Sequence, residues 1–355
     1  QKGTSEEPIE TSFIHPINGS SPVCDWPKIP KETDISVSRV TSVERMPSLS
    51  QKKEEVLKGL LRQEKSLPPK YFYDERGSKL FDQITNLPEY YITRTEIKLY
   101  QELLPSLARI IDLKKLCVVE FGAGSVKKIR FILEHLPVEA YVPIDISSDH
   151  LNLAAEQLSR EYPQVDIFAL SADYTKPSEL PERFDTYDKL GFFPGSSIGN
   201  FEKADAESFL IGTNKTLGTG CRVLIGVDVK KDRKVLEAAY DDSSGITAAF
   251  NLNMLRHLNA TVGSDFDLTG FQHESHYNAE LGCIQMHLRS VRDQVVKIAD
   301  QEIALAKREL IHTENSFKYS PDEFAQLANN AGYEVENLWQ DGNGLFSTFL
   351  LRSLN

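Results

Sequence analysis

The chain has 355 residues, of which 40% are hydrophobic, so it can bury a sizeable core as one large domain or two smaller ones. Its 52 acidic residues outnumber its 40 lysines and arginines, and the net charge of −12 disfavours nucleic acid as the main partner. The four cysteines are scattered and form no CxxC pair, so neither a zinc site nor a disulfide framework is indicated. No apolar run nears the roughly 18 residues of a membrane span, so a membrane protein is not indicated.

The N-terminal part of the chain shows little regular pattern. Residues 1–50 are rich in Pro, Ser, Thr and charge without sustained hydrophobic periodicity, which predicts a loosely ordered arm. The apolar spacing over 52–61 predicts an amphipathic helix that the Pro-Pro pair at 68–69 stops. A second helical pattern covers 92–107.

From residue 115 onwards strand and helix patterns alternate, which is typical of a largely parallel sheet. The segments are KLCVVEFG, VKKIRFILEHL, EAYVPIDIS, SDHLNLAAEQLSREY, VDIFALSADY, KLGFFPGSSIG and CRVLIGVDV. Near the end, YEVENLWQD and LFSTFLLRS predict a strand pair joined by the turn at 342–344. An open sheet of this kind binds its ligand at the carboxyl ends of its strands, where Glu120, Asp145, Asp173 and Gly195 fall.

A glycine turn, FGAGS, joins the first of these strands to its helix. Gly122 and Gly124 let the backbone approach a ligand closely, and the helix N-terminus offers free N–H groups, so a nucleotide-like ligand is favoured. A dinucleotide fingerprint needs a third glycine where Lys127 stands, and no GxxxxGK[ST] phosphate loop occurs. These observations favour a nucleoside without phosphates.

Acidic residues at the next two strand ends suit a nucleoside. Asp145 could accept hydrogen bonds from both ribose hydroxyls, and Asp173 could bind an adenine amino group while Tyr174 stacks on the ring. Each Asp alone is as typical of a helix cap or a solvated loop. Their order after the glycine turn fits S-adenosylmethionine (SAM).

Long motifs flank this core, namely LPPKYFYDERGSKLFDQITNLPEYYITRTE, FFPGSSIGNF, LIGVDVKKDRKVLEAAYDDSSGITAAFNLNMLRHLN, IQMHLRS and IHTENSFKYS. Together they closely resemble the histidine-specific, SAM-dependent methyltransferases, which convert histidine to its trimethylbetaine hercynine in the first step towards ergothioneine. The resemblance covers about Leu67 to Leu351. It implies a doubly wound, Rossmann-like α/β methyltransferase sheet with a second, substrate-binding lobe.

The resemblance also implies roles for residues within the matching motifs. On the cofactor side, Tyr73 would close over SAM. Gly122 and Lys128 would meet its methionine part, Asp145 its ribose, and Asp173 with Tyr174 its adenine.

On the substrate side, the resemblance implies that Tyr90 and Asn200 are the catalytic residues, because Tyr90 would contact histidine and Asn200 would hydrogen-bond the amine that is methylated. The further substrate contacts would be Gly195 of the PGSS turn, Tyr240 at the carboxylate, Met286 packed on the imidazole, and Glu314 and Ser316 at its two ring nitrogens. The charged run over 227–242 is otherwise expected to be a mostly solvated helix with Tyr240 turned inward.

These residue types suit methyl transfer from a sulfonium. The reaction is an in-line displacement, so the protein must align a neutral amine about 3 Å from the methyl carbon, and it needs no covalent nucleophile or metal. Aromatic faces such as Tyr90 could stabilise the quaternary product by about 0.5–2 kcal/mol. Glu314, in the role that the resemblance implies, is the predicted main specificity determinant, because a site built to hydrogen-bond a polar ring rejects rings without that partner by roughly 10⁴-fold.

Other interpretations of the same residues remain open. Tyr90 and Met286 could fill a core, Glu314 could be a solvated charge, and Asn200 could cap the helix near Glu202. The chain could also methylate a tryptophan-derived amine, as related enzymes of the superfamily do, or be a non-catalytic SAM-binding adapter.

The expected organisation has an N-terminal arm at 1–50, a substrate-binding lobe at 51–94 plus 231–313, and a SAM-binding lobe at 95–230 plus 314–355. L-Histidine is the expected partner, with neither nucleic acid nor a membrane. Without a signal-peptide pattern or a coiled-coil repeat, a cytoplasmic monomer is expected.

Overall fold

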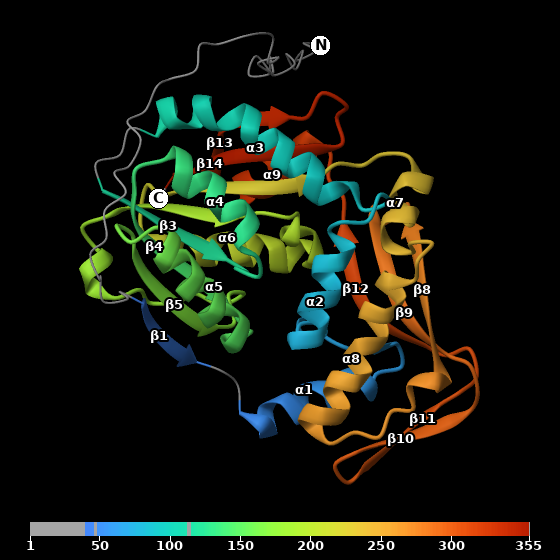
Figure 1. The fold of residues 1–355 in the computed structure, drawn as a ribbon. Coiled ribbons are helices and arrows are strands. Elements are labelled where there is room, and N and C mark those ends of the chain that lie inside the picture. Colours follow the sequence, from blue (N-terminus) through green and yellow to red (C-terminus); the bar gives the residue numbers. More distant parts are fainter. Residues whose placement is uncertain (1–39, 46–47, 112–114, 355) are drawn as a thin grey trace, which may run out of the picture.

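The computed structural model describes residues 40–45, 48–111 and 115–354, which form a large sheet and a smaller one side by side (Figure 1). The large sheet has eight strands in the order β1-β5-β4-β3-β6-β7-β14-β13. The first six strands in this order are parallel to one another. Strand β14 pairs in antiparallel fashion with β7, and β13 pairs in antiparallel fashion with β14. Their bounds are β1 (Val40–Arg45), β3 (Leu116–Phe121), β4 (Val138–Asp145), β5 (Asp166–Ala172), β6 (Asp188–Phe193), β7 (Arg222–Asp228), β13 (Tyr333–Gln340) and β14 (Phe346–Ser353).

Strand β3 shows how the large sheet buries both of its faces. Every residue of β3 is buried, and successive side chains of a strand point to opposite faces. Leu116 and Val118 pack into one hydrophobic core, whereas Cys117 and Val119 pack into a second core on the other face. The first core includes α3 (Tyr91–Ile110), α4 (Val126–His135) and α5 (Ser148–Glu161), and the second includes α6 (Lys203–Leu217) and α9 (Pro321–Asn330).

The strand order creates a ligand crevice beside β3. The chain runs outward from β3 through β4 and β5 and then returns to β6 on the other side of β3. Such a reversal opens a crevice at the carboxyl ends of the strands. The predicted doubly wound sheet and its closing antiparallel pair are confirmed.

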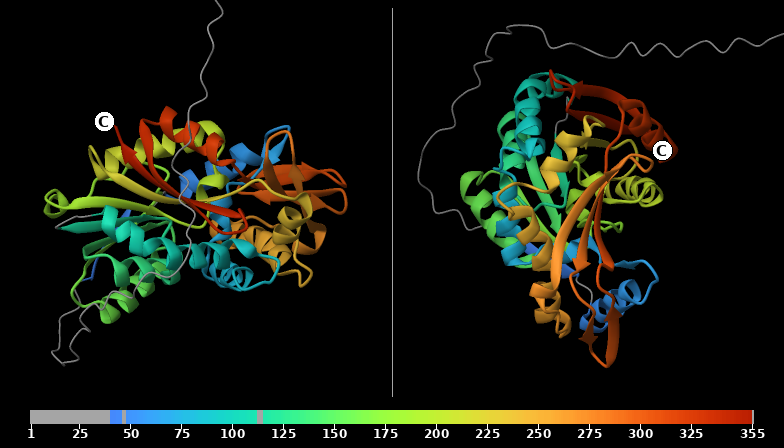
Figure 2. Two further views of the ribbon diagram at one scale, coloured as in Figure 1. Left: turned by 90° about the horizontal axis from the view of Figure 1, so that it is seen from above. Right: turned by 90° about the vertical axis from the view of Figure 1, so that its right-hand side faces the viewer.

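The smaller sheet has the strand order β2-β12-β9-β8 and carries the helix α8 against it (Figures 1 and 2). Strands β12, β9 and β8 pair in antiparallel fashion, and α2 packs across α8. The bounds are β2 (Lys65–Ser66), β8 (Phe271–Asn278), β9 (Cys283–Ser290), β12 (Leu310–Phe317), α2 (Glu75–Ile84) and α8 (Ile246–Val262). The remaining elements are α1 (Leu49–Leu60), α7 (Arg233–Tyr240), the hairpin β10 (Gln294–Ile298) with β11 (Gln301–Leu305), and the 3₁₀ helices η1 (Pro69–Phe72), η2 (Glu182–Phe184), η3 (Ser197–Asn200) and η4 (Leu268–Gly270).

The predicted loosely ordered arm is wrong at its C-terminal end. Residues Val40–Arg45 form the edge strand β1, which pairs in parallel with β5, and α1 begins at Leu49 with Ser48 as its cap. A six-residue edge strand is held by backbone hydrogen bonds to one neighbour, so it needs little apolar periodicity of its own. Residues 1–39 and 46–47 lie outside the described residues.

The predicted lobe boundary at 313/314 falls inside strand β12. Glu314 and Ser316 therefore belong to the smaller sheet, because β12 pairs with β9 along most of its length. The functional division into two lobes stays a prediction. Among the described helices, none is long and apolar enough to cross a membrane.

Candidate functional site

Two connected cavities lie where the large sheet meets the smaller one. A cleft of ≈ 650 Å³ follows the carboxyl ends of β3, β4 and β5, and a pocket of ≈ 60 Å³ adjoins it. Tyr73, Tyr90, Gly195, Asn200 and Glu314 line both. A ligand in the cleft would therefore meet a second ligand in the pocket.

The cleft collects every residue that the sequence predicts as a SAM contact. Gly122 has a left-handed φ of +73°, and a side-chain carbon there would lie 3.4 Å from the Tyr174 ring. Glycine therefore keeps the turn close to that ring. The six predicted SAM contacts, all of which line the cleft, are Tyr73, Gly122, Lys128, Asp145, Asp173 and Tyr174.

The two strand-end acids differ in their surroundings. Asp145 Oδ1 accepts a hydrogen bond from the Ser147 amide at 2.8 Å, and burial raises the pKa of the Asp145 carboxyl to about 6. Asp173 Oδ1 accepts from the Thr175 amide at 3.1 Å and from its hydroxyl at 2.6 Å. Asp173 thus holds its loop as an Asx turn while it lines the cleft.

A buried carboxylate that the sequence analysis missed joins the two cavities. Glu96 of α3 is 0% exposed, lies 2.5 Å from Lys128 Nζ, and accepts the Gly195 N–H at 2.8 Å. Tyr100 donates to the same carboxylate at 2.8 Å. The available signal was a glutamate on the helix face that also carries Ile92 and Leu99, where an apolar residue is expected.

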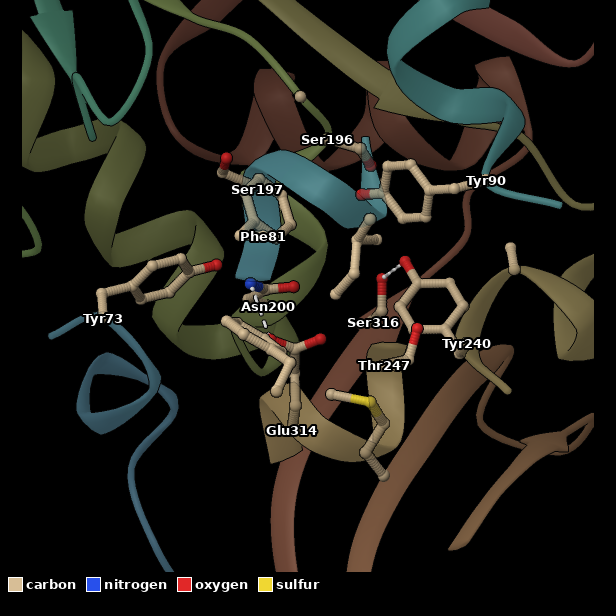
Figure 3. A pocket seen from close by; sticks show the side chains of 15 residues that line it. Tyr73, Phe81, Tyr90, Ser196, Ser197, Asn200, Tyr240, Thr247, Glu314 and Ser316 are labelled. Atoms are coloured by element: carbon tan, nitrogen blue, oxygen red, sulfur yellow. Dashed lines mark hydrogen bonds between the residues drawn. The ribbon is translucent and has the colours of Figure 1, made fainter. Parts of the chain in front are cut away.

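The pocket collects all seven predicted substrate contacts (Figure 3). They come from parts of the chain that are distant in sequence, including the start of α3, the turn after β6, the end of α7 and two strands of the smaller sheet. Figure 3 shows Tyr73 on one side, Tyr240 with Ser316 on the other, and Asn200 between them. The seven are Tyr90, Gly195, Asn200, Tyr240, Met286, Glu314 and Ser316.

Aromatic side chains form the wall around Tyr90. The Tyr90 ring lies edge-on to Phe81 and to Tyr240, with 6.2 Å between ring centroids in each case. Tyr73 packs edge-on against Phe81 at 5.8 Å and against Phe250 at 5.6 Å. Such rings present both π faces and hydroxyl groups to a cationic ligand.

Asn200 and Glu314 form the polar centre of the pocket. Asn200 Nδ2 donates to Glu314 Oε2 at 3.3 Å, and burial raises the pKa of Glu314 to about 8, opposed by the nearby Lys318 charge. The cap position of α6 is Glu202, so Asn200 is not the helix cap. Its side chain instead contacts the Glu314 carboxylate and lines both the pocket and the cleft.

The opposite wall carries two hydroxyls on a buried ion network. Tyr240 and Ser316 place their oxygens 2.8 Å apart, and Lys318 donates to each of them at 2.9 Å. The Lys318 ammonium lies 2.8 Å from Asp228 Oδ2, and both side chains are fully buried.

This network corrects one sequence expectation. The run over 227–242 is not a mostly solvated helix throughout, because Asp228 ends strand β7 and Lys231 pairs with it at 2.5 Å, their side chains 0% and 7% exposed. Lys318 was also missed. Lys318 lies one residue beyond the end of β12 and two residues after Ser316, which was a usable signal, since alternate residues along an extended chain share one face.

The donor set suits an organic cofactor. The close approach at Gly122 and the partly buried carboxylate of Asp145, which lines the cleft, fit a nucleoside that offers hydroxyl groups. In the part of the chain that the structure describes, no group of three or more His, Cys, Asp or Glu is placed to hold a metal ion.

The chain is similar to several proteins of known family. The family model for histidine-specific, SAM-dependent methyltransferases matches residues 52–353. A histidine N-alpha-methyltransferase of Mycolicibacterium smegmatis is 36% identical over 83% of this chain and 93% of its own length. Ergothioneine biosynthesis protein 1 of Neurospora crassa is 33% identical over 79% of this chain and 32% of its own length. The crystal structure of a SAM-dependent methyltransferase from Clostridium acetobutylicum aligns with 78% of this chain and 99% of its own, at 11% identity and a TM-score of 0.47.

Proposed function

Because the chain belongs to the histidine-specific, SAM-dependent methyltransferases, we propose that it methylates the α-amino group of L-histidine three times to give hercynine. The observation that carries the proposal is the position of Glu314 and Ser316. Both line one small pocket, and Asn200 connects that pocket to the cleft that suits SAM. Hercynine would then enter ergothioneine synthesis.

SAM, when bound, supplies an electrophilic methyl group on a sulfonium. We assign Asp145 to its ribose hydroxyls, Asp173 with Tyr174 to its adenine, and Gly122 with Lys128 to its methionine part. Tyr73 would cover it, because Tyr73 lines both cavities. These residues bind and orient, and the mechanism needs no metal.

The amine would be held by Asn200 and Tyr90. Since Asn200 Nδ2 donates to Glu314, its carbonyl oxygen is free to accept a hydrogen bond from the substrate amine. An amide acceptor does not lock the amine in its charged form as an adjacent carboxylate would. The neutral lone pair can then align with the methyl carbon, and Tyr90 can face the growing positive charge.

The imidazole would be read at the opposite end of the substrate. Glu314 can accept the ring N–H, and the Ser316 hydroxyl can donate to the other ring nitrogen. Met286, which is 2% exposed, would pack on the ring face. Gly195 and Tyr240 would complete the pocket, with the Tyr240 hydroxyl directed to the substrate carboxylate.

The test is mass spectrometry of L-histidine incubated with the protein and SAM. The proposal predicts successive additions of roughly 14 mass units on the α-amine, ending at the trimethylated product. A reaction that stops after one or two additions would contradict trimethylation. No addition to histidine would overturn the substrate assignment.

The two other interpretations require separate experiments. Competition between histidine and tryptophan at equal concentration tests the tryptophan-type alternative, and a preference for tryptophan would remove the specificity role of Glu314. Calorimetric titration with SAM, together with the mass-spectrometric turnover assay, tests the adapter alternative, which predicts binding without turnover. We further propose that the enzyme acts as a cytoplasmic monomer, which sedimentation of the purified protein and fractionation of cells would check.

A further inference from the structure

Lys318 lies behind the pocket wall rather than in it. Its ammonium is enclosed with the Asp228 carboxylate, and neither side chain is exposed. The pocket is lined by the two neighbours of Lys318, Tyr240 and Ser316, but not by Lys318 itself. Any effect of Lys318 on a substrate therefore passes through these two hydroxyls.

The hydrogen bonds of Lys318 determine how the two hydroxyls can act. An ammonium has three N–H donors and no acceptor, and those of Lys318 reach Asp228 Oδ2, the Tyr240 oxygen and the Ser316 oxygen. Both hydroxyl oxygens thus accept from Lys318. Only one hydroxyl proton can lie between the two oxygens, so the other proton is directed away from Lys318.

Electrostatics keep the pair in this arrangement. Burial favours the protonated phenol and raises the pKa of Tyr240 well above its usual value. Burial alone would raise the pKa of Asp228, but Lys318 and Lys231 outweigh it and hold the pKa below its usual range. Asp228 therefore stays a carboxylate that anchors Lys318, and Lys231 adds a second cation on the same carboxylate.

We propose that Lys318 is a positioning residue for substrate recognition, which orients the hydroxyl pair of Tyr240 and Ser316 so that the proton directed away from Lys318, on Ser316, is donated into the pocket. Opposite them, Glu314 offers an acceptor. The pocket then recognises a ring that donates one N–H to Glu314 and accepts a hydrogen bond at its unprotonated nitrogen. Neutral imidazole is such a ring. This inference rests on the proposed histidine substrate and names the residue that gives Ser316 its donor direction.

The experiment compares two ligands by calorimetry in the presence of S-adenosylhomocysteine. L-Histidine has both ring groups, whereas pyrrolylalanine keeps the N–H and lacks the acceptor nitrogen. We expect Lys318→Met to reduce the preference for histidine on the order of tenfold, because the hydroxyls lose their fixed direction. Lys231→Met is the matched control, because Lys231 pairs with the same carboxylate but does not contact Tyr240 or Ser316.

A second variant covers the risk that Lys318→Met leaves Asp228 short of a partner and fails to fold. The double variant Asp228→Asn with Lys318→Met removes both charges, and we expect it to show the same loss of preference. An unchanged preference in the folded double variant, or an equal loss in Lys231→Met, would overturn the proposal. A wild-type protein that prefers histidine in this assay but does not methylate it would instead overturn the proposed function.

Discussion

On the cofactor side of the cleft, Gly122, Asp145 and Asp173 lie at the carboxyl ends of three neighbouring strands of one sheet, so a single topological rule brings them together. On the substrate side, Asn200, Tyr240 and Glu314 come from a 3₁₀ helix, the end of α7 and a strand of the smaller sheet. The first side depends on local turns. The second depends on buried charges whose partners are far away in the chain.

The largest expected effect is on the substrate side. Glu314→Ala should raise the KM for histidine on the order of 100-fold or more, because the ring N–H loses its buried acceptor. The Kd for SAM should stay within about twofold, since the predicted contacts to its ribose, adenine and methionine part come from the large sheet and the loops and helix that follow its strands. Steady-state kinetics and calorimetry measure the two quantities. An unchanged KM would place Glu314 outside the substrate site.

On the cofactor side, Asp145→Asn should weaken SAM binding by about tenfold or more, because hydrogen bonds to a charged acceptor become neutral ones. Burial raises the pKa of Asp145 to about 6, so the carboxylate is lost as the pH falls through that value. SAM affinity of the wild type should therefore fall between about pH 7 and pH 5. Calorimetry that finds the same pH dependence in the Asn variant would exclude Asp145 as its source.

The glycine turn allows a matched pair of variants. Gly122→Ala forces a side chain into φ +73° and into contact with the Tyr174 ring, whereas an added carbon at Gly124 meets no atom within 4 Å. Gly122→Ala should lower the free energy of unfolding by about 1–2 kcal/mol, and Gly124→Ala should change it far less. Urea unfolding of both variants checks this. Equal effects would show that the turn does not need a left-handed residue.

The ionisation of Glu314 links the substrate pocket to the stability of the fold. The folded-state pKa of Glu314, about 8, is above the ordinary value of 4.5, so its stabilising contribution is complete below the lower value and is lost as the pH rises through 8. Glu314→Gln has no such charge. Relative to wild type, the variant without ligands should gain about 1–3 kcal/mol of unfolding free energy at about pH 8, and little at about pH 5. If the gain in unfolding free energy does not depend on pH, it does not come from the ionisation of Glu314.

The same contrast explains what the sequence could predict. The alternation of strands and helices and the glycine turn are local patterns, and all of them are present in the structure. The side chains predicted for both ligands do gather around the two cavities, although their individual roles stay predictions. The substrate residues could be predicted only because long motifs of the sequence resemble a known family. The spacing of these residues along the chain does not show that α7 and β12 lie together.

The missed features depend on tertiary pairing. Glu96, Asp228 and Lys318 read as surface charges until the partners that allow their burial are known. Strand β1 is too short to show a clear period, and the irregular register between His312 and Glu314 in β12 depends on its pairing with β9. The partners of these residues lie far away in the chain, so a short window of residues does not reveal them.

A structure of the protein with L-histidine and S-adenosylhomocysteine would test the substrate site most directly. The proposed arrangement predicts the imidazole between Glu314 and Ser316, the carboxylate at Tyr240, and the α-amine at Asn200 facing the sulfur of the cofactor product. An imidazole directed to the cleft, with the amine remote from Asn200, would contradict it.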